Sequence, residues 1–298
     1  MITCSSRPIF FTLLMAGIVF FISDAKAEQA KYVALGSSYA AGPGVGINSY
    51  DPNPNDSAYK CSRSATNYSH ILAGKLNLDL NDVTCSGATT ADILDRSQHN
   101  GLTPQIDAVE ADTKLVTVTI GGNDVNYVGN LMGYSCLDSG AKGCSTTVVS
   151  DADVDKRFAA LKGRLSTISS EVHRRAPQAT LVFTGYLPVL PFKTPAAGDT
   201  CYTKVPLTVQ DAIRMENMYT RLVSLIRQVA LANGDIDIRG SVVGYGHDAC
   251  SPSPFTAGYY PRKTTGWPFS AAYHPNQAGM AAMADAIEQA LQNANVRF

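Results

Sequence analysis

The chain has 298 residues, a formal net charge of −1 and only 16% charged residues. A nearly neutral chain with scattered lysines and arginines offers no basic surface for nucleic acid and no polybasic patch for a membrane. We therefore expect a small or neutral partner molecule. The length fits one α/β domain with a substantial core.

The first residues indicate an export signal. Arg7 supplies a positive charge, residues 8–23 are almost wholly apolar, and residues 25–27 have the small-x-small pattern of a signal peptidase site. The apolar run is shorter than the roughly 20 residues that span a bilayer, which disfavours a retained membrane anchor. We expect a signal peptide over residues 1–27 and one domain over residues 28–298, secreted or periplasmic, without stable membrane insertion.

The cysteines indicate disulfide bonds. Of seven cysteines, Cys4 lies in the expected leader, and the other six form an even set in an exported protein. Sequence alone leaves the pairing open, but closure between neighbours favours three pairs: Cys61 with Cys85, Cys136 with Cys144, and Cys201 with Cys250. The spacings contain no C-x-x-C motif, so we expect no zinc site, and we expect no cofactor.

Short apolar runs alternate with amphipathic segments along the rest of the chain. The predicted strands are residues 31–35, 78–84, 115–120, 179–184 and 235–243. The predicted helices are a segment capped by Thr66 or Asn67 that runs to Leu76, then residues 91–96, 153–175, 205–232 and 277–291. Glycines and prolines keep residues 41–61 irregular, and loops of this length are often functional.

This alternation predicts the fold class. Strands separated by helices pair in parallel through right-handed crossovers, which gives a three-layer α/β/α sandwich with a parallel sheet of about five strands. The active site of such a fold lies at the carboxyl ends of the strands. Four segments with chemically useful residues fall at strand ends or in the last loop: Gly36-Ser37-Ser38-Tyr39, Cys85-Ser86-Gly87-Ala88, Gly121-Gly122-Asn123-Asp124 and Tyr273-His274-Pro275-Asn276.

In this order the four segments resemble the blocks of the SGNH (GDSL-type) hydrolase superfamily, and the six cysteines resemble its secreted, three-disulfide esterase and lipase branch. The resemblance covers nearly the whole mature chain. It implies a flavodoxin-like sheet and a serine carboxylic ester hydrolase that forms an acyl-enzyme. The expected partner is a small-molecule or lipid acyl ester, and we expect a monomer.

The resemblance also implies roles for four residues. Ser38 matches the nucleophile, and its own N–H is one expected oxyanion donor. The backbone N–H of Gly87 and the side-chain amide of Asn123 match the other two donors, and His274 matches the general base. An ester hydrolase needs these parts together: a hydroxyl, a base within hydrogen-bond reach, and donors aimed at the oxyanion.

Two positions depart from the family pattern. The acidic residue before the nucleophile is replaced by Ser37, and the continuation after the serine favours Ser38 over Ser37 as nucleophile. The aspartate that many members carry three residues before the histidine is replaced by Ala271. We expect the carbonyl of Ala271 to orient His274, because a carbonyl accepts the Nδ1 proton, with Asp248 as the alternative carboxylate.

Other interpretations remain open at this stage. Taken singly, the serine and the histidine fit a turn and a helix cap. The aromatic residues Trp267, Phe269 and Tyr273 suit an acyl pocket as well as core packing. A carbohydrate deacetylase uses the same catalytic parts, and the two missing acids suggest a non-catalytic binding protein built on a decayed hydrolase.

Overall fold

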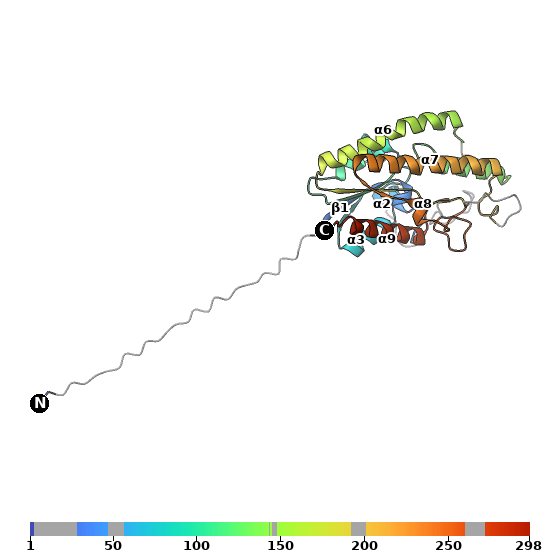
Figure 1. The fold of residues 1–298 in the computed structure, drawn as a ribbon. Helices are drawn as coiled ribbons and strands as arrows, with labels where there is room; N and C mark the ends of the chain where they lie inside the picture. The colour runs from blue at the N-terminus through green and yellow to red at the C-terminus, as the bar shows by residue number, and fades with distance from the viewer. Residues whose placement is uncertain (3–28, 47–56, 143, 145–147, 192–200, 260–271) are drawn as a thin grey trace.

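The computed structural model describes residues 1–2, 29–46, 57–142, 144, 148–191, 201–259 and 272–298 (Figure 1). Its centre is one parallel sheet in the order β2-β1-β3-β4-β5. The strands are β1 (Lys31–Gly36), β2 (Asp79–Asp82), β3 (Leu115–Thr119), β4 (Thr180–Thr184) and β5 (Ile236–Ile238). The predicted five-stranded parallel sheet is therefore confirmed.

Helices cover both faces of this sheet. Figure 1 shows α6 and α7 on one side and α3 and α9 on the other. The helices are α1 (Ser38–Ala41), α2 (Ser57–Lys60), α3 (Tyr68–Leu76), α4 (Thr90–Leu94), α5 (Tyr127–Asp138), α6 (Asp151–Arg175), α7 (Val209–Asn233), α8 (Gly240–Val243) and α9 (Gln277–Asn293), with a 3₁₀ helix η1 (Gln105–Ala108). The molecule is the three-layer sandwich that the alternation predicts.

Alternate strand residues build two cores. Val33 and Leu35 of β1 pack with the α6 and α7 side, whereas Tyr32 and Ala34 pack with the α3 and α9 side. Successive side chains of a strand point to opposite faces, so a strand covered on both faces has nearly all of its side chains buried. The whole of β3 is buried, and the hydroxyls of its two threonines, Thr117 and Thr119, form hydrogen bonds with the hydroxyls of Tyr32 and Tyr68.

Side-chain caps fix where the long helices begin. Ser150, Thr208 and Asn276 each accept a backbone N–H in the first turn of α6, α7 and α9. The cap at Thr208 explains why α7 begins at Val209 and not at residue 205 as predicted. Gly234, with φ of 78°, ends α7 in the left-handed conformation that glycine favours.

The structure corrects two predicted elements. The last strand ends at Ile238, and the segment predicted to continue it forms α8 instead. Helix α5 was not predicted at all. It contains glycines, and its N-cap Asn126 makes no side-chain cap, so the usual helix signals are missing.

Several predicted features lie outside the described residues. They are nearly all of the expected leader, residues 47–56 of the long loop, Trp267, Phe269 and Ala271. Within the described part of the chain, no helix combines the length and apolar character needed to cross a membrane.

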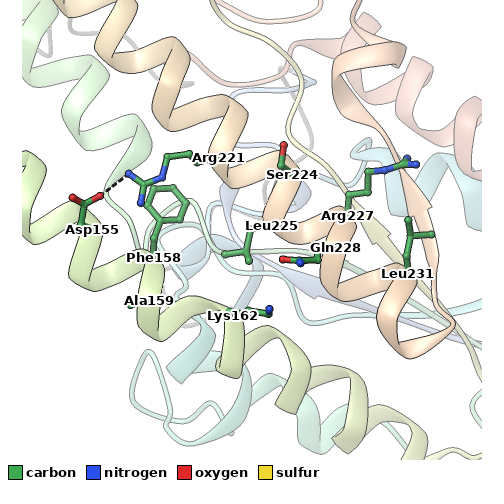
Figure 2. A pocket seen from close by; sticks show the side chains of 10 residues that line it. All are labelled: Asp155, Phe158, Ala159, Lys162, Arg221, Ser224, Leu225, Arg227, Gln228 and Leu231. Atoms are coloured by element: carbon green, nitrogen blue, oxygen red, sulfur yellow. Dashed lines mark hydrogen bonds and ion pairs between the residues drawn. The ribbon is translucent and has the colours of Figure 1, made fainter.

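An open surface groove of about 830 Å³ lies between α6 and α7 (Figure 2). Its wall includes Phe158, whose ring lies under the guanidinium of Arg221 at 4.3 Å, and Arg221 in turn pairs with Asp155. None of the predicted catalytic residues lines it. The candidate site must therefore be sought at the strand ends.

Candidate active site

The turn after β1 begins at a glycine that no other residue can replace without a clash. Gly36 has φ of +143°, and a Cβ there would lie 2.6 Å from the carbonyl oxygen of Thr119 on the neighbouring strand. The chain then enters α1 at Ser38. The buried side chain of Gln105 holds this point, since it accepts the Gly36 N–H at 2.7 Å and donates to the Gly36 carbonyl at 3.1 Å.

The two serines after Gly36 have different surroundings. The Ser38 hydroxyl lies 2.7 Å from Nε2 of His274, 236 residues away in sequence. The Ser37 hydroxyl lies 3.4 Å from the Thr119 carbonyl, and its side chain is nearly inaccessible. Ser38 thus has the contact that a nucleophile makes with its base, and Ser37 packs against β3.

The other ring nitrogen of His274 fixes its tautomer. Nδ1 lies 2.8 Å from the carbonyl oxygen of Ala272. A carbonyl only accepts hydrogen bonds, so Nδ1 carries the proton and Nε2 presents its lone pair to the Ser38 hydroxyl. The described acceptor of Nδ1 is thus the carbonyl of Ala272, whereas Ala271, which the sequence favoured, lies outside the described residues. The residue between Ala272 and the histidine, Tyr273, has φ of +63°.

Asp248, the predicted alternative partner of the histidine, has another contact. Its carboxylate accepts the N–H of Cys250 at 2.9 Å, and its carbonyl accepts the N–H of Ser251. The carboxylate thus caps the turn beside a disulfide. No hydrogen bond joins it to His274 among the residues that the structure describes.

Buried tyrosines hold the segment that carries His274. The Tyr39 hydroxyl donates to the carbonyl of Tyr273, and the Tyr39 ring lies 5.2 Å from the imidazole. The Tyr273 side chain is fully buried, with its hydroxyl on Ser135, so it packs in the core. Tyr186 lies against Tyr39 at 4.5 Å, and burial raises the pKa of Tyr186 to about 12, which keeps its hydroxyl protonated.

The segment after β2 forms a tight turn. The N–H of Ala88 donates to the carbonyl of Cys85, and Gly87 has φ of +86°. The N–H of Cys85 donates to the carbonyl of Gly36, which ties this turn to the nucleophile turn. Within the described residues, the N–H groups of Gly87 and Ser38 have no acceptor. Such N–H groups are available to an oxyanion.

The segment after β3 lies against the same turn. The side-chain amide of Asn123 donates to the Ala88 carbonyl at 2.8 Å, and one of its two N–H bonds remains for another acceptor. The carboxylate of Asp124 accepts both the N–H and the hydroxyl of Thr90, at the start of α4. Burial raises the pKa of Asp124. Two adjacent side chains thus brace the turns after β2 and β3 together.

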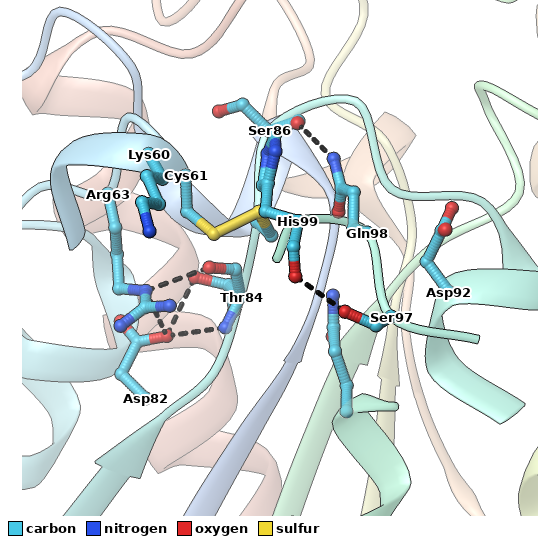
Figure 3. The surroundings of a disulfide bond; sticks show 12 residues. Lys60, Cys61, Arg63, Asp82, Thr84, Ser86, Asp92, Ser97, Gln98 and His99 are labelled. Atoms are coloured by element: carbon cyan, nitrogen blue, oxygen red, sulfur yellow. Dashed lines mark hydrogen bonds and ion pairs between the residues drawn. A yellow bond between two sulfur atoms is a disulfide. The ribbon is translucent and has the colours of Figure 1, made fainter. Parts of the chain in front are cut away.

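The six cysteines from Cys61 to Cys250 pair as predicted. The bonds are Cys61–Cys85, Cys136–Cys144 and Cys201–Cys250. The first is next to the Gly87 turn, and His99 lies close to it (Figure 3). Because both sulfurs are used in the disulfide, they provide no thiolates for a metal ion.

Sequence reasoning found the four block residues but missed the residues that hold them. Gln98, Gln105, Tyr39 and Tyr186 all contact a block segment in the structure. Only Tyr39 had a signal, because it follows Ser38 directly. The others come from distant loops, and no local pattern marks them.

Known proteins share this fold and sequence. Residues 34–282 match the GDSL-like Lipase/Acylhydrolase family. Lipase 2 of Streptomyces coelicolor is 37% identical over 247 residues, which cover 77% of this chain and 78% of that protein.

Two solved structures are also similar. Phospholipase A1 from Streptomyces albidoflavus has a TM-score of 0.66 and 26% identity, with 88% of this chain and 99% of that chain covered. The extracellular lipase of Streptomyces rimosus has the same fold, with a TM-score of 0.64, 24% identity and the same coverage. The chain therefore belongs to the GDSL-like lipase/acylhydrolase family and is a carboxylic ester hydrolase.

Proposed function

We propose that the enzyme hydrolyses acyl esters through an acyl-enzyme on Ser38, with His274 as general base. The observation that carries this proposal is the 2.7 Å contact between Ser38 Oγ and His274 Nε2, together with the carbonyl that holds the proton on Nδ1. A serine hydroxyl is a weak nucleophile until a base takes its proton.

The reaction has two halves. Oγ of Ser38 bonds to the ester carbonyl carbon while its proton moves to Nε2, and the carbonyl oxygen becomes an oxyanion. The bond to the leaving alcohol then breaks as Nε2 returns the proton to its oxygen. In the second half His274 takes a proton from water while the water oxygen bonds to the acyl carbon; the bond between that carbon and Oγ of Ser38 then breaks, Nε2 returns the proton to Oγ, and the acid leaves. The N–H groups of Ser38 and Gly87 and the amide of Asn123 stabilise the oxyanion.

The proposed substrates are acyl esters, including those of lipids. The similar proteins named lipase and phospholipase A1 support this class. Three disulfides and the extracellular lipase relative support export, and we propose that cleavage near Ala27 releases one domain, residues 28–298, as a monomer.

Purified Ser38→Ala and His274→Ala should each lose at least about 10³-fold in kcat/KM on a panel of aryl esters of increasing acyl length. Ser37→Ala is the matched comparison and should keep activity within about tenfold, because Ser37 makes no contact with the base. Circular dichroism shows whether each variant is folded.

The panel also separates the alternatives. Substantial hydrolysis by folded Ser38→Ala protein would refute the assigned nucleophile. Activity restricted to acetyl esters would favour a carbohydrate deacetylase, and absence of hydrolysis by the wild type on every ester and on phospholipid vesicles would favour a binding protein.

A further inference from the structure

The proposed oxyanion donor Gly87 occupies the third position of a β-turn. Cys85 and Ala88 are the first and last residues of this turn, since the Ala88 N–H donates to the Cys85 carbonyl at 3.0 Å. The φ of +86° at Gly87 makes it a type II turn. The peptide unit between Ser86 and Gly87 is its central unit, and the N–H of that unit is the proposed donor.

This central peptide unit has two orientations open to it. Type I and type II turns have nearly the same ends but differ by a rotation of about 180° of the central peptide. Glycine adopts positive and negative φ with similar ease, so Gly87 allows both. After such a rotation the Gly87 N–H would point away from its present direction. Another group must therefore fix the orientation.

The side chain of Gln98 makes the required contact. Its Nε2 donates to the carbonyl oxygen of Ser86 at 2.7 Å, as the dashed line in Figure 3 shows. In a planar trans peptide the C=O and the following N–H point in opposite directions, so a bond that fixes the Ser86 oxygen also fixes the Gly87 N–H. Gln98 is also the neighbour that a side chain at position 87 would meet, since a Cβ there would lie 3.4 Å from this nitrogen, at ordinary contact distance.

The rest of the Gln98 side chain supports the same assignment. Its Oε1 is buried and has no hydrogen-bond partner among the described residues, so the amide is held through its nitrogen alone. With the amide reversed, two acceptor oxygens would face each other at the Ser86 carbonyl. Leaving a buried acceptor unpaired costs free energy, and this cost is consistent with a functional role for the nitrogen.

We propose that Gln98 is a positioning residue for the oxyanion hole: it locks the Ser86–Gly87 peptide in the type II orientation and aims the Gly87 N–H at the oxyanion. The inference rests on the proposed roles of Ser38 and Gly87. The bond to the carbonyl also polarises the peptide, which makes the N–H a stronger donor. Gln98 itself touches no reacting atom.

The test replaces Gln98 by Met, which has a similar length and no donor. Loss of a whole oxyanion donor costs about 10²–10³ in kcat, and loosening one donor should cost about tenfold, with KM changed less than about twofold. Affinity for a trifluoromethyl ketone, whose adduct with the serine carries an oxyanion, should fall by a similar factor. The amide resonance of Gly87 should shift in ¹⁵N-labelled protein without ligand.

Ser97→Ala is the matched control, because Ser97 lies in the same loop and its hydroxyl, within the described residues, bonds only to the His99 carbonyl. It should leave kcat, ketone affinity and the Gly87 resonance unchanged. A kcat and ketone affinity of Gln98→Met equal to wild type would overturn the proposal, as would an unmoved Gly87 resonance. If Gln98→Met fails to fold, Gln98→Ala is subject to the same measurements. If Ser38→Ala protein instead hydrolyses esters as fast as the wild type, the proposed function is refuted. The Gly87 resonance still tests, in that case, whether Gln98 fixes the Ser86–Gly87 peptide.

Discussion

The imidazole of His274 makes two described hydrogen bonds of opposite polarity, and no carboxylate of the described residues forms a hydrogen bond with it. Nδ1 donates to the Ala272 carbonyl, and Nε2 faces the Ser38 hydroxyl. A carbonyl fixes the tautomer as a carboxylate does, but it carries no full charge to stabilise the imidazolium that forms during the reaction. The sequence indicated a backbone carbonyl, that of Ala271, which lies outside the described residues; the described acceptor is the carbonyl of Ala272.

Asp248→Asn tests whether a carboxylate completes the site. Neutralising a true triad acid costs about 10⁴ in kcat. Asn keeps the oxygen that accepts the Cys250 N–H, so the fold should survive. We expect kcat/KM of Asp248→Asn within about threefold of wild type, because the carboxylate makes no described contact with His274. A loss of three or more orders of magnitude in folded protein would mean that Asp248 acts as the acid.

Asn123→Ala tests the side-chain oxyanion donor. It should lower kcat by about 10²–10³ with little change in KM, because the donor acts in the transition state. Asn217→Ala, at an exposed position of α7, is the control and should leave both constants unchanged. Steady-state kinetics on one aryl ester suffices. A change confined to KM would contradict the assigned role.

At the scale of elements, three strand ends carry the proposed chemistry, and their turns are tied directly to one another. Backbone bonds join Gly36 to Cys85 and Ser37 to Thr119, and the Asn123 amide joins the turn after β3 to Ala88. The sequence predicted this convergence because polar residues follow apolar strand runs. It did not predict α5, whose start lacks a side-chain cap, or the end of the last strand at Ile238.

The pH dependence of stability in Asp124→Asn tests the hydrogen bonds by which Asp124, after β3, holds Thr90 at the start of α4. Burial raises the pKa of Asp124 above its usual value of 3.8, so the native state binds more protons than the unfolded state in the window just above that value. This group therefore contributes less stability as pH rises through the window. The free energy of unfolding of Asp124→Asn, relative to wild type, should rise from pH 4 upward and then level off.

Urea unfolding of both proteins between pH 4 and pH 8 measures this difference. The hydrogen bonds to Thr90 that the substitution alters add an offset that does not change with pH. A difference between the proteins that is flat, or that falls as pH rises, would contradict the raised pKa.

At the scale of the whole molecule, the sequence predicted the layers, the sheet and the disulfide pairing, because these follow from periodicity and from closure between neighbouring cysteines. The sequence did not predict the side chains that hold the block segments in place. Gln98 reaches a block segment from the loop after α4, and Gln105 does so from the 3₁₀ helix η1; only the folded chain brings them there. Such contacts have no period and no local motif.

The proposed mechanism depends most on Ser38 as the nucleophile, and trapping with an alkyl fluorophosphonate tests this assignment most directly. The serine oxygen bonds to phosphorus, fluoride leaves, and the hydroxyl proton passes to His274. Tandem mass spectrometry of the digested protein then locates the added group. We predict stoichiometric labelling on Ser38, none on the adjacent Ser37, and strongly slowed labelling in His274→Ala. Label on Ser37 or on any other residue of the wild-type protein would contradict the account.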